Sequence, residues 1–152
     1  MRIAFKGLNM PDNSRNLWVA KAENFLEVNY DHFLRKPVVS GKPSIIFVDP
    51  NSGCDLGRPE CLHSLRTDQY PPGRMNLDLF RTIMHEYGET AISLRLYNYG
   101  ELFLNPDVYE MVRIAKKKGI GTAISLNLNA CDPQKIVECG LDDLVLLLDG
   151  AT

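Results

Sequence analysis

The chain has no long hydrophobic run, few cysteines and no excess of charge of either sign, and each shortage excludes a class of protein. The longest unbroken apolar stretch, Leu144 to Leu148, is far shorter than the roughly 20 residues that a transmembrane helix needs. The amino terminus lacks the apolar core and cleavage site of a secretory signal. Four cysteines in 152 residues are too few for a disulfide scaffold and predict thiols or metal ligands. We therefore expect a cytoplasmic protein with no membrane partner.

The charges are nearly balanced, with 17 Lys and Arg residues against 19 Asp and Glu residues. The net charge of −2 does not indicate a nucleic-acid partner. Hydrophobic residues at 45% and charged residues at 24% are typical of a globular chain. The length fits one domain or a piece of a larger one, and we expect a helical extension over residues 1–42 followed by a domain over residues 43–152.

Within the extension, large apolar residues recur at three- and four-residue steps and predict an amphipathic helix from about Ser14 to Arg35. Pro37 ends it, because the residue before a proline disfavours the helical conformation. We expect the apolar stripe of this helix to pack on the neighbouring domain. The stripe consists of Trp18, Ala22, Phe25, Leu26, Tyr30, Phe33 and Leu34.

From residue 44 onward, four short apolar runs that predict strands alternate with helical patterns. The strands are expected at residues 44–48, 91–96, 121–128 and 143–148. The helices between them have recognisable starts and stops. Asn105 and Asp132 are expected N-caps before prolines, and Gly88, Gly119 and Gly140 are expected stops.

Strands separated by helices require parallel pairing with right-handed crossovers, which leaves an open doubly wound sheet or part of a β/α barrel. No glycine-rich nucleotide motif follows any strand, which weakens the open-sheet alternative. We predict that the four strands lie in sequence order as an arc of a barrel with helices outside. The fourth strand would leave a bare parallel edge, so we expect a longer protein or a partner to complete the sheet.

In either architecture the functional groups belong at the carboxyl ends of the strands. The loops there start at Asp49, Tyr97, Asn127 and Asp149. The first of these loops contains Cys54 and Cys61.

The spacing of these cysteines, with Asp55-Leu56 and Pro59 between them, resembles the Cys-x₃-Cys-x₂-Cys motif of the radical S-adenosylmethionine (radical SAM) enzymes. Tyr99-Gly100-Glu101 stands where that family has Gly-Gly-Glu, and Gly73-Arg74-Met75 is similar to its Gly-x-Met. The likeness covers about residues 43–152. It implies the first half of a partial (β/α)₆ barrel of the TIM type.

The resemblance also implies cofactors and partners. A 4Fe–4S cluster and S-adenosylmethionine would generate a 5′-deoxyadenosyl radical that abstracts hydrogen from a peptide or small-molecule substrate, with electrons from a donor. No catalytic side chain is implied. The implied metal ligands are Cys54 and Cys61, and the implied cofactor contacts are Gly100, Glu101, Asn127 and Asp149.

The position of the middle cysteine is occupied by Arg58. Thiolates hold iron–sulfur clusters, and a guanidinium has no lone pair to replace one. We therefore expect a cluster that is weakly held or absent. Two classes of function remain, a fragment of a radical enzyme and a non-catalytic barrel that binds a partner or ligand. Arg58 favours the second class, whereas Gly100-Glu101 and Asp149 favour the first.

The other cysteines and histidines have simpler interpretations. Cys131 and Cys139 flank a short predicted helix and are expected to be small buried residues. His32 and His85 lie in predicted helices and are expected to be surface or packing residues. His63 follows Cys61 closely, but a structural zinc site needs four ligands and the loop does not supply them.

Overall fold

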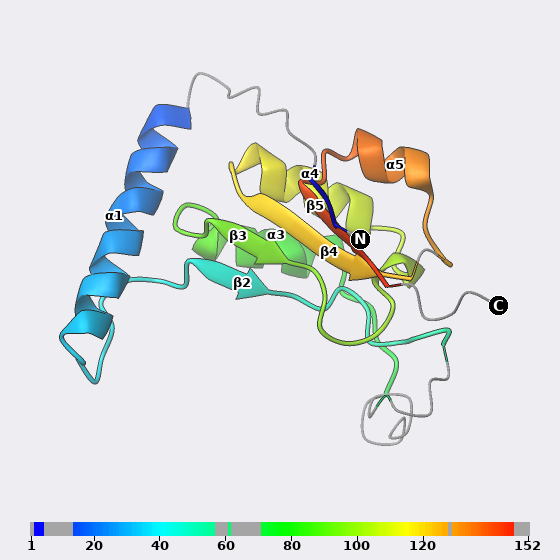
Figure 1. Cartoon of the computed structure of the whole chain (residues 1–152), viewed down its shortest axis with the longest axis horizontal. Coiled ribbons are helices and arrows are strands. Elements are labelled where there is room, and N and C mark those ends of the chain that lie inside the picture. The colour runs from blue at the N-terminus through cyan, green and yellow to red at the C-terminus, as the bar shows by residue number, and fades with distance from the viewer. Residues whose placement is uncertain (1, 5–13, 57–60, 62–70, 128, 148–152) are drawn as a thin grey trace.

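The computed structural model describes residues 2–4, 14–56, 61, 71–127 and 129–147. Its strands form a single sheet in the order β1-β5-β4-β3-β2 (Figure 1). The four strands from β2 to β5 are parallel and lie in sequence order, which confirms the predicted arrangement. The strands are β1 (Arg2–Ala4), β2 (Ile45–Phe47), β3 (Ser93–Arg95), β4 (Gly121–Leu126) and β5 (Asp143–Leu146).

Helices alternate with the parallel strands, so the chain has the predicted α/β fold. Figure 1 shows α3 and α4 on one side of the sheet, and α1 at the end of the molecule opposite α5. None of the helices in the described ranges is long and apolar enough to cross a membrane. The helical elements are α1 (Ser14–Phe33), α3 (Leu77–Tyr87), the 3₁₀ helix η1 (Leu102–Leu104), α4 (Val108–Lys117) and α5 (Pro133–Glu138).

The core lies between the sheet and helices α3, η1, α4 and α5. Alternate residues of the strands and their continuations, such as Leu94 of β3 and Leu96 just after it, are fully buried there. Phe80 of α3 and Met111 of α4 meet them from the helical side. Because side chains alternate across a strand, the remaining residues of each strand lie on the opposite face, which no described helix of the parallel units covers.

The predicted helix signals are confirmed at most positions. The Asp132 side chain caps α5, as predicted, and the Asn76 side chain, which was not predicted as a cap, accepts the Leu79 N–H at the start of α3. Gly119 and Gly140 follow their helices with φ of +62° and +78°, a conformation that glycine adopts without steric cost. Helix α3 ends before Gly88, as predicted.

The expected start of α4 at Asn105-Pro106 is wrong by two residues. Asp107 is the N-cap of α4, and the segment before it forms η1. The Asn105 side chain is only 1% exposed, and its amide donates to the carbonyl oxygens of Pro50 and Met75. Asn105 therefore ties two loops together, a role that its position before a proline does not reveal.

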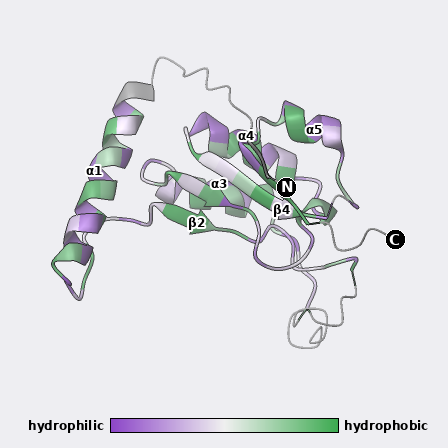
Figure 2. Cartoon of the chain, in the orientation of Figure 1, coloured by the Kyte–Doolittle hydropathy of each residue, from purple (hydrophilic) through white to green (hydrophobic). Residues whose placement is uncertain are grey.

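The predicted packing of α1 is also wrong. The large residues of its apolar stripe are exposed, from 37% for Trp18 to 81% for Phe33. Among the α1 side chains whose burial is described, the buried ones are Lys21, Asn24 and Asp31. Figure 2 shows polar and apolar residues alternating along α1, with neither type confined to one end. The helix therefore contacts the domain through polar groups.

These polar groups satisfy backbone atoms at the ends of loops. Lys21 Nζ donates to the carbonyl oxygens of Gly88 and Ala91, which lie between α3 and β3. The Asn24 side chain accepts the Lys42 N–H at 2.8 Å and donates to the Lys42 carbonyl oxygen at 3.0 Å. Buried backbone groups require hydrogen-bond partners, and here α1 supplies them.

The region 1–42 is not helical throughout, because it begins with β1. This strand pairs antiparallel with β5, and Ile3 lies opposite Leu144. The expectation of a bare edge at the fourth parallel strand is therefore wrong, since β1 covers that edge. A three-residue strand joined through α1 to the rest of the chain leaves no periodic pattern that sequence analysis could detect.

Candidate functional site

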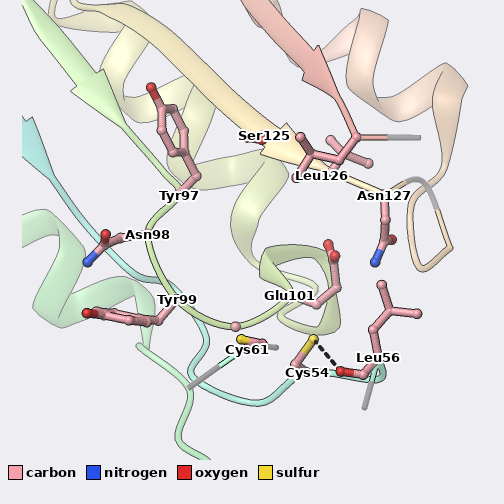
Figure 3. Close-up of a pocket in the computed structure, with 12 residues that line it drawn as sticks. Cys54, Leu56, Cys61, Tyr97, Asn98, Tyr99, Glu101, Ser125, Leu126 and Asn127 are labelled. Atoms are coloured by element: carbon pink, nitrogen blue, oxygen red, sulfur yellow. Dashed lines mark hydrogen bonds between the residues drawn. The ribbon is translucent and has the colours of Figure 1, made fainter. Parts of the chain in front are cut away.

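A cavity of about 190 Å³ lies at the carboxyl ends of the parallel strands (Figure 3). Loops that follow β2, β3 and β4 all contribute to its lining, as the parallel arrangement predicts. The lining includes Cys54, Leu56, Cys61, Tyr97, Asn98, Tyr99, Gly100, Glu101, Ser125, Leu126, Asn127 and Leu147. Five of the predicted site residues therefore border one space.

The loops after β2 and β3 are joined through the backbone around Gly100. The Glu101 N–H donates to the Gly53 carbonyl oxygen at 2.7 Å. Asn51, which is 3% exposed, donates to the carbonyl oxygens of both Gly53 and Glu101. Gly100 has φ +72°, and a Cβ there would overlap the Asn51 carbonyl oxygen. Only glycine fits this contact, which places Glu101 beside the cysteine loop.

Residues 71–75 form a second support for the cysteine loop. The Ser52 N–H donates to the Gly73 carbonyl oxygen, and the Met75 N–H donates to that of Pro50. These contacts give the predicted Gly73-Arg74-Met75 motif a structural role, because they fix the start of the loop that carries Cys54.

The two cysteines have different surroundings. Cys54 is exposed, and its thiol lies 3.6 Å from the Leu56 carbonyl oxygen, a weak hydrogen bond drawn in Figure 3. Cys61 is half-buried and borders the same cavity. Among the described residues, no group of three His, Cys, Asp or Glu side chains could hold a metal ion. The predicted pair of thiols therefore meets at the cavity without a third donor from the described residues.

Glu101 and Asn127 approach the cavity from different loops. Glu101 is 5% exposed, and Figure 3 shows its carboxylate extending between the cysteine loop and Asn127. Gly100 lies on the rim just before it. Two other residues named from the sequence, Arg58 and Asp149, lie outside the described residues.

A further cysteine lies close to this acid. Burial raises the pKa of the Cys131 thiol, and the negative charge of Glu101 raises it further. Burial also raises the pKa of the neighbouring Tyr109, whose hydroxyl accepts the Asp132 N–H at 2.8 Å. Both groups therefore stay protonated at neutral pH, so Cys131 is a neutral thiol. Cys131 is half-buried, so the prediction that it is buried is wrong.

The remaining predictions on isolated residues are confirmed where the structure describes them. Cys139 is buried, and its thiol donates to the Ile136 carbonyl oxygen. His32 and His85 are exposed on α1 and α3. His63 lies outside the described ranges.

Tyr97 and Ser125 line the cavity, but they are not among the predicted site residues. A signal for Ser125 exists in the sequence, because Ile124 and Leu126 on either side belong to the core. Alternation along a strand then places Ser125 on the opposite face. The same argument applies to Tyr97, which follows the core residue Leu96.

No family model and no curated protein matches the chain. Two solved structures of BtrN are similar to it, both at 22% sequence identity. The structure of BtrN in complex with AdoMet and 2-DOIA matches with a TM-score of 0.61 over 72% of this chain and 47% of BtrN. The structure of BtrN in an open conformation matches with a TM-score of 0.57 over 68% of this chain and 49% of BtrN.

The chain spans about half the length of BtrN. At this identity the likeness concerns the fold and not the individual site residues. It agrees with the parallel order of β2 to β5 and their intervening helices. The chain therefore shares the fold of part of BtrN, a radical SAM enzyme.

Proposed function

We propose that the chain is the first half of a radical SAM-type barrel and that its cavity binds S-adenosylmethionine. The observation that supports this most is the meeting of Cys54, Cys61, Gly100, Glu101 and Asn127 at one cavity. The AdoMet in the BtrN complex supports the same ligand. Since this chain spans about half of BtrN, the substrate and the complete reaction also belong to the proposal.

Glu101 is assigned to the α-amino group of S-adenosylmethionine. Its carboxylate is almost fully buried and is directed into the cavity, where an ammonium group would be its natural counter-ion. Attraction between opposite charges is stronger in such a site than in bulk water, because the effective dielectric constant is lower. Gly100 lets the backbone approach the ligand closely, because it has no side chain on the rim.

The other end of the ligand is assigned to Asn127 and to the apolar residues of the lining. Asn127 offers an amide for the ribose hydroxyls, and Asp149 is proposed to join it. Leu126 and Leu147 offer apolar surface for the adenine ring. Pockets for ligands of this size usually hold 300–1,000 Å³, so in a cavity of about 190 Å³ the ligand would extend past the rim.

The donors present do not fit a 4Fe–4S cluster held by three thiolates. Two thiols, Cys54 and Cys61, border the cavity, and among the described residues no third donor joins them. The sequence has Arg58 where the motif requires the middle cysteine, and a guanidinium is always charged and offers no lone pair. Formation of a 5′-deoxyadenosyl radical for hydrogen abstraction requires the complete cluster and an electron donor. We therefore assign ligand binding, and not turnover, to this chain.

Equilibrium dialysis with labelled S-adenosylmethionine tests this proposal. The unaltered chain is expected to bind one equivalent, and Glu101→Gln is expected to weaken binding at least about tenfold, because a charge-assisted contact is lost. Glu23→Gln on the exposed surface of α1 is the matched control and should leave the affinity unchanged. Equal affinity in Glu101→Gln and the unaltered chain would refute the role of Glu101, and failure of the unaltered chain to bind would refute the function.

A further inference from the structure

We infer that the sheet face opposite the helices holds a recognition site for an anionic group of the substrate, built on Arg95 and Tyr97. The inference rests on the proposed function, because it names the class of substrate that would lie beside S-adenosylmethionine. Its physical basis is a half-buried guanidinium that forms no ion pair with a carboxylate of the described residues and donates to Tyr97, which lines the cavity.

Arg95 and Tyr97 project from the face of the sheet that the helices leave open. Their neighbours Leu94 and Leu96 belong to the core on the helical side, so alternation places Arg95 and Tyr97 on the other side. In the sheet register, Arg95 lies between Phe47 of β2 and Ala123 of β4. Ala123 is 4% exposed, so the β4 position beside Arg95 is covered, whereas Phe47 on the other side is 62% exposed.

The charge of Arg95 is not neutralised by the described part of the chain. Arg95 Nη1 donates to the Tyr97 hydroxyl oxygen at 3.1 Å. This acceptor is a hydroxyl group and not a carboxylate. No ion pair joins Arg95 to any described carboxylate. Asp143 lies in the same register row, but β4 separates the two residues by about 10 Å, twice the usual strand spacing.

Tyr97 connects this charge to the cavity. Its ring packs edge-on against Phe47, with ring centroids 6.3 Å apart and an interplanar angle of 84°, which restrains the phenol. Tyr97 and Ser125 both line the cavity from the sheet side. Figure 3 shows them across the cavity from the cysteine loop. A polar row therefore runs from Arg95 through Tyr97 and Ser125 to the cavity.

The sheet side and the loop side of the cavity carry opposite charges. Glu101 supplies a carboxylate among the loops, and Arg95 supplies a cation on the sheet. A guanidinium presents a planar fork of donors that binds carboxylate or phosphate through two parallel hydrogen bonds. With S-adenosylmethionine on Glu101, Arg95 would orient a second molecule by its anionic group. The substrate class is thus a compound that carries a carboxylate or a phosphate monoester.

NMR titration of the full ¹⁵N-labelled chain tests this inference through the arginine Nε–Hε signals. Inorganic phosphate and succinate serve as separate probes at constant ionic strength, with sodium chloride as the balancing salt. One or both probes should shift the Arg95 signal saturably. Arg95→Gln, which also assigns the signal, should weaken binding of that probe about tenfold as followed by amide shifts of β3 and β4. Arg81→Gln, an exposed position on α3, is the matched control and should change nothing.

The outcomes separate the two anions and the two proposals. Saturation by phosphate alone indicates a phosphorylated substrate, and saturation by succinate alone indicates a carboxylate. If neither probe shifts Arg95, or if Arg95→Gln binds both equally well, the inference is overturned. S-adenosylmethionine binding should be unchanged in Arg95→Gln. If the unaltered chain does not bind S-adenosylmethionine but the anionic probe still shifts the Arg95 signal, the proposed function is refuted and the anion site is retained.

Discussion

Gly100 is the residue whose backbone decides the geometry of the cavity. Its φ of +72° and its contact with the cysteine loop exclude any side chain, since a Cβ would also lie 2.8 Å from the Gly53 carbonyl oxygen. We expect Gly100→Ala to lower the free energy of unfolding by about 2–3 kcal/mol, because backbone strain adds to the steric conflict. The variant should also lose S-adenosylmethionine binding.

Denaturant unfolding and equilibrium dialysis measure the two effects of Gly100→Ala. Gly73→Ala is the matched control, because a Cβ at Gly73 would make an ordinary contact 3.6 Å from Ser52 Oγ. Similar stability and binding in the two variants would contradict the importance assigned to the close approach at Gly100.

The second prediction at this scale concerns Arg58. Anaerobic reconstitution of the unaltered chain with iron and sulfide should give much less than a full cluster, because one of three thiolates is absent. Arg58→Cys should raise the iron content and produce the broad visible absorption of a 4Fe–4S cluster. Arg58→Ser, which removes the charge without adding a thiol, is the control. Equal iron in the unaltered chain and Arg58→Cys would show that another residue already completes the site.

The sequence predicted these site residues from their order along the chain, but not the contacts that hold them. Cys54, Glu101 and Asn127 follow successive strands, so a parallel sheet must place them at one edge. Asn51 and Asn105 were not recognised as supports, because their partners are backbone carbonyl groups up to 55 residues away. Such long-range hydrogen bonds leave no local pattern.

At the scale of the element, α1 shows where periodicity misleads. The apolar stripe predicted a buried face, yet Lys21, Asn24 and Asp31 are the residues that the fold buries. The loop backbone groups that face α1, such as the Gly88 carbonyl and the Lys42 amide, are polar and require hydrogen-bond partners. Polar residues of α1 are therefore buried against them. For α3, α4 and α5 the same kind of reasoning succeeded, because each packs on the apolar face of the sheet.

Lys21 makes the docking of α1 dependent on pH. The pKa of Lys21 is lowered from 10.5 to about 8, mainly by burial and to a smaller extent by the positive charge of Lys118. Between these two pH values the unfolded chain holds more protons than the folded chain at this residue. The free energy of unfolding should therefore rise with pH from about 8 to 10.5, by at most about 3.5 kcal/mol from this group.

Denaturant titrations that follow the fluorescence of Trp18, the only tryptophan and a residue of α1, measure this effect. Lys21→Met is the comparison variant, because it retains much of the buried chain and cannot titrate. The tyrosines, the cysteines and the other lysines titrate equally in both proteins. The difference between the pH profiles of the unaltered chain and Lys21→Met therefore isolates Lys21. Parallel profiles would exclude Lys21 as the source.

At the scale of the whole molecule, the parallel order of β2 to β5 was predictable, whereas the antiparallel strand β1 was not. Alternating strands and helices permit few arrangements, because crossovers between parallel strands are right-handed and consecutive strands usually pair. The position of β1 depends on the open edge of β5, which exists only once the other four strands have assembled. A prediction that proceeds along the chain has no means of finding it.

The last prediction concerns this edge. The Leu147 N–H donates to Leu126 of β4, so alternation along β5 directs the Leu144 N–H toward β1 and the Val145 N–H toward β4. Deleting residues 1–4 should therefore speed hydrogen exchange at Leu144 and leave Val145 protected within the same protein. NMR-detected exchange compares the two neighbouring amides directly, so a general loss of stability would appear as faster exchange at both. Unchanged exchange at Leu144 would mean that β1 does not protect this edge in solution.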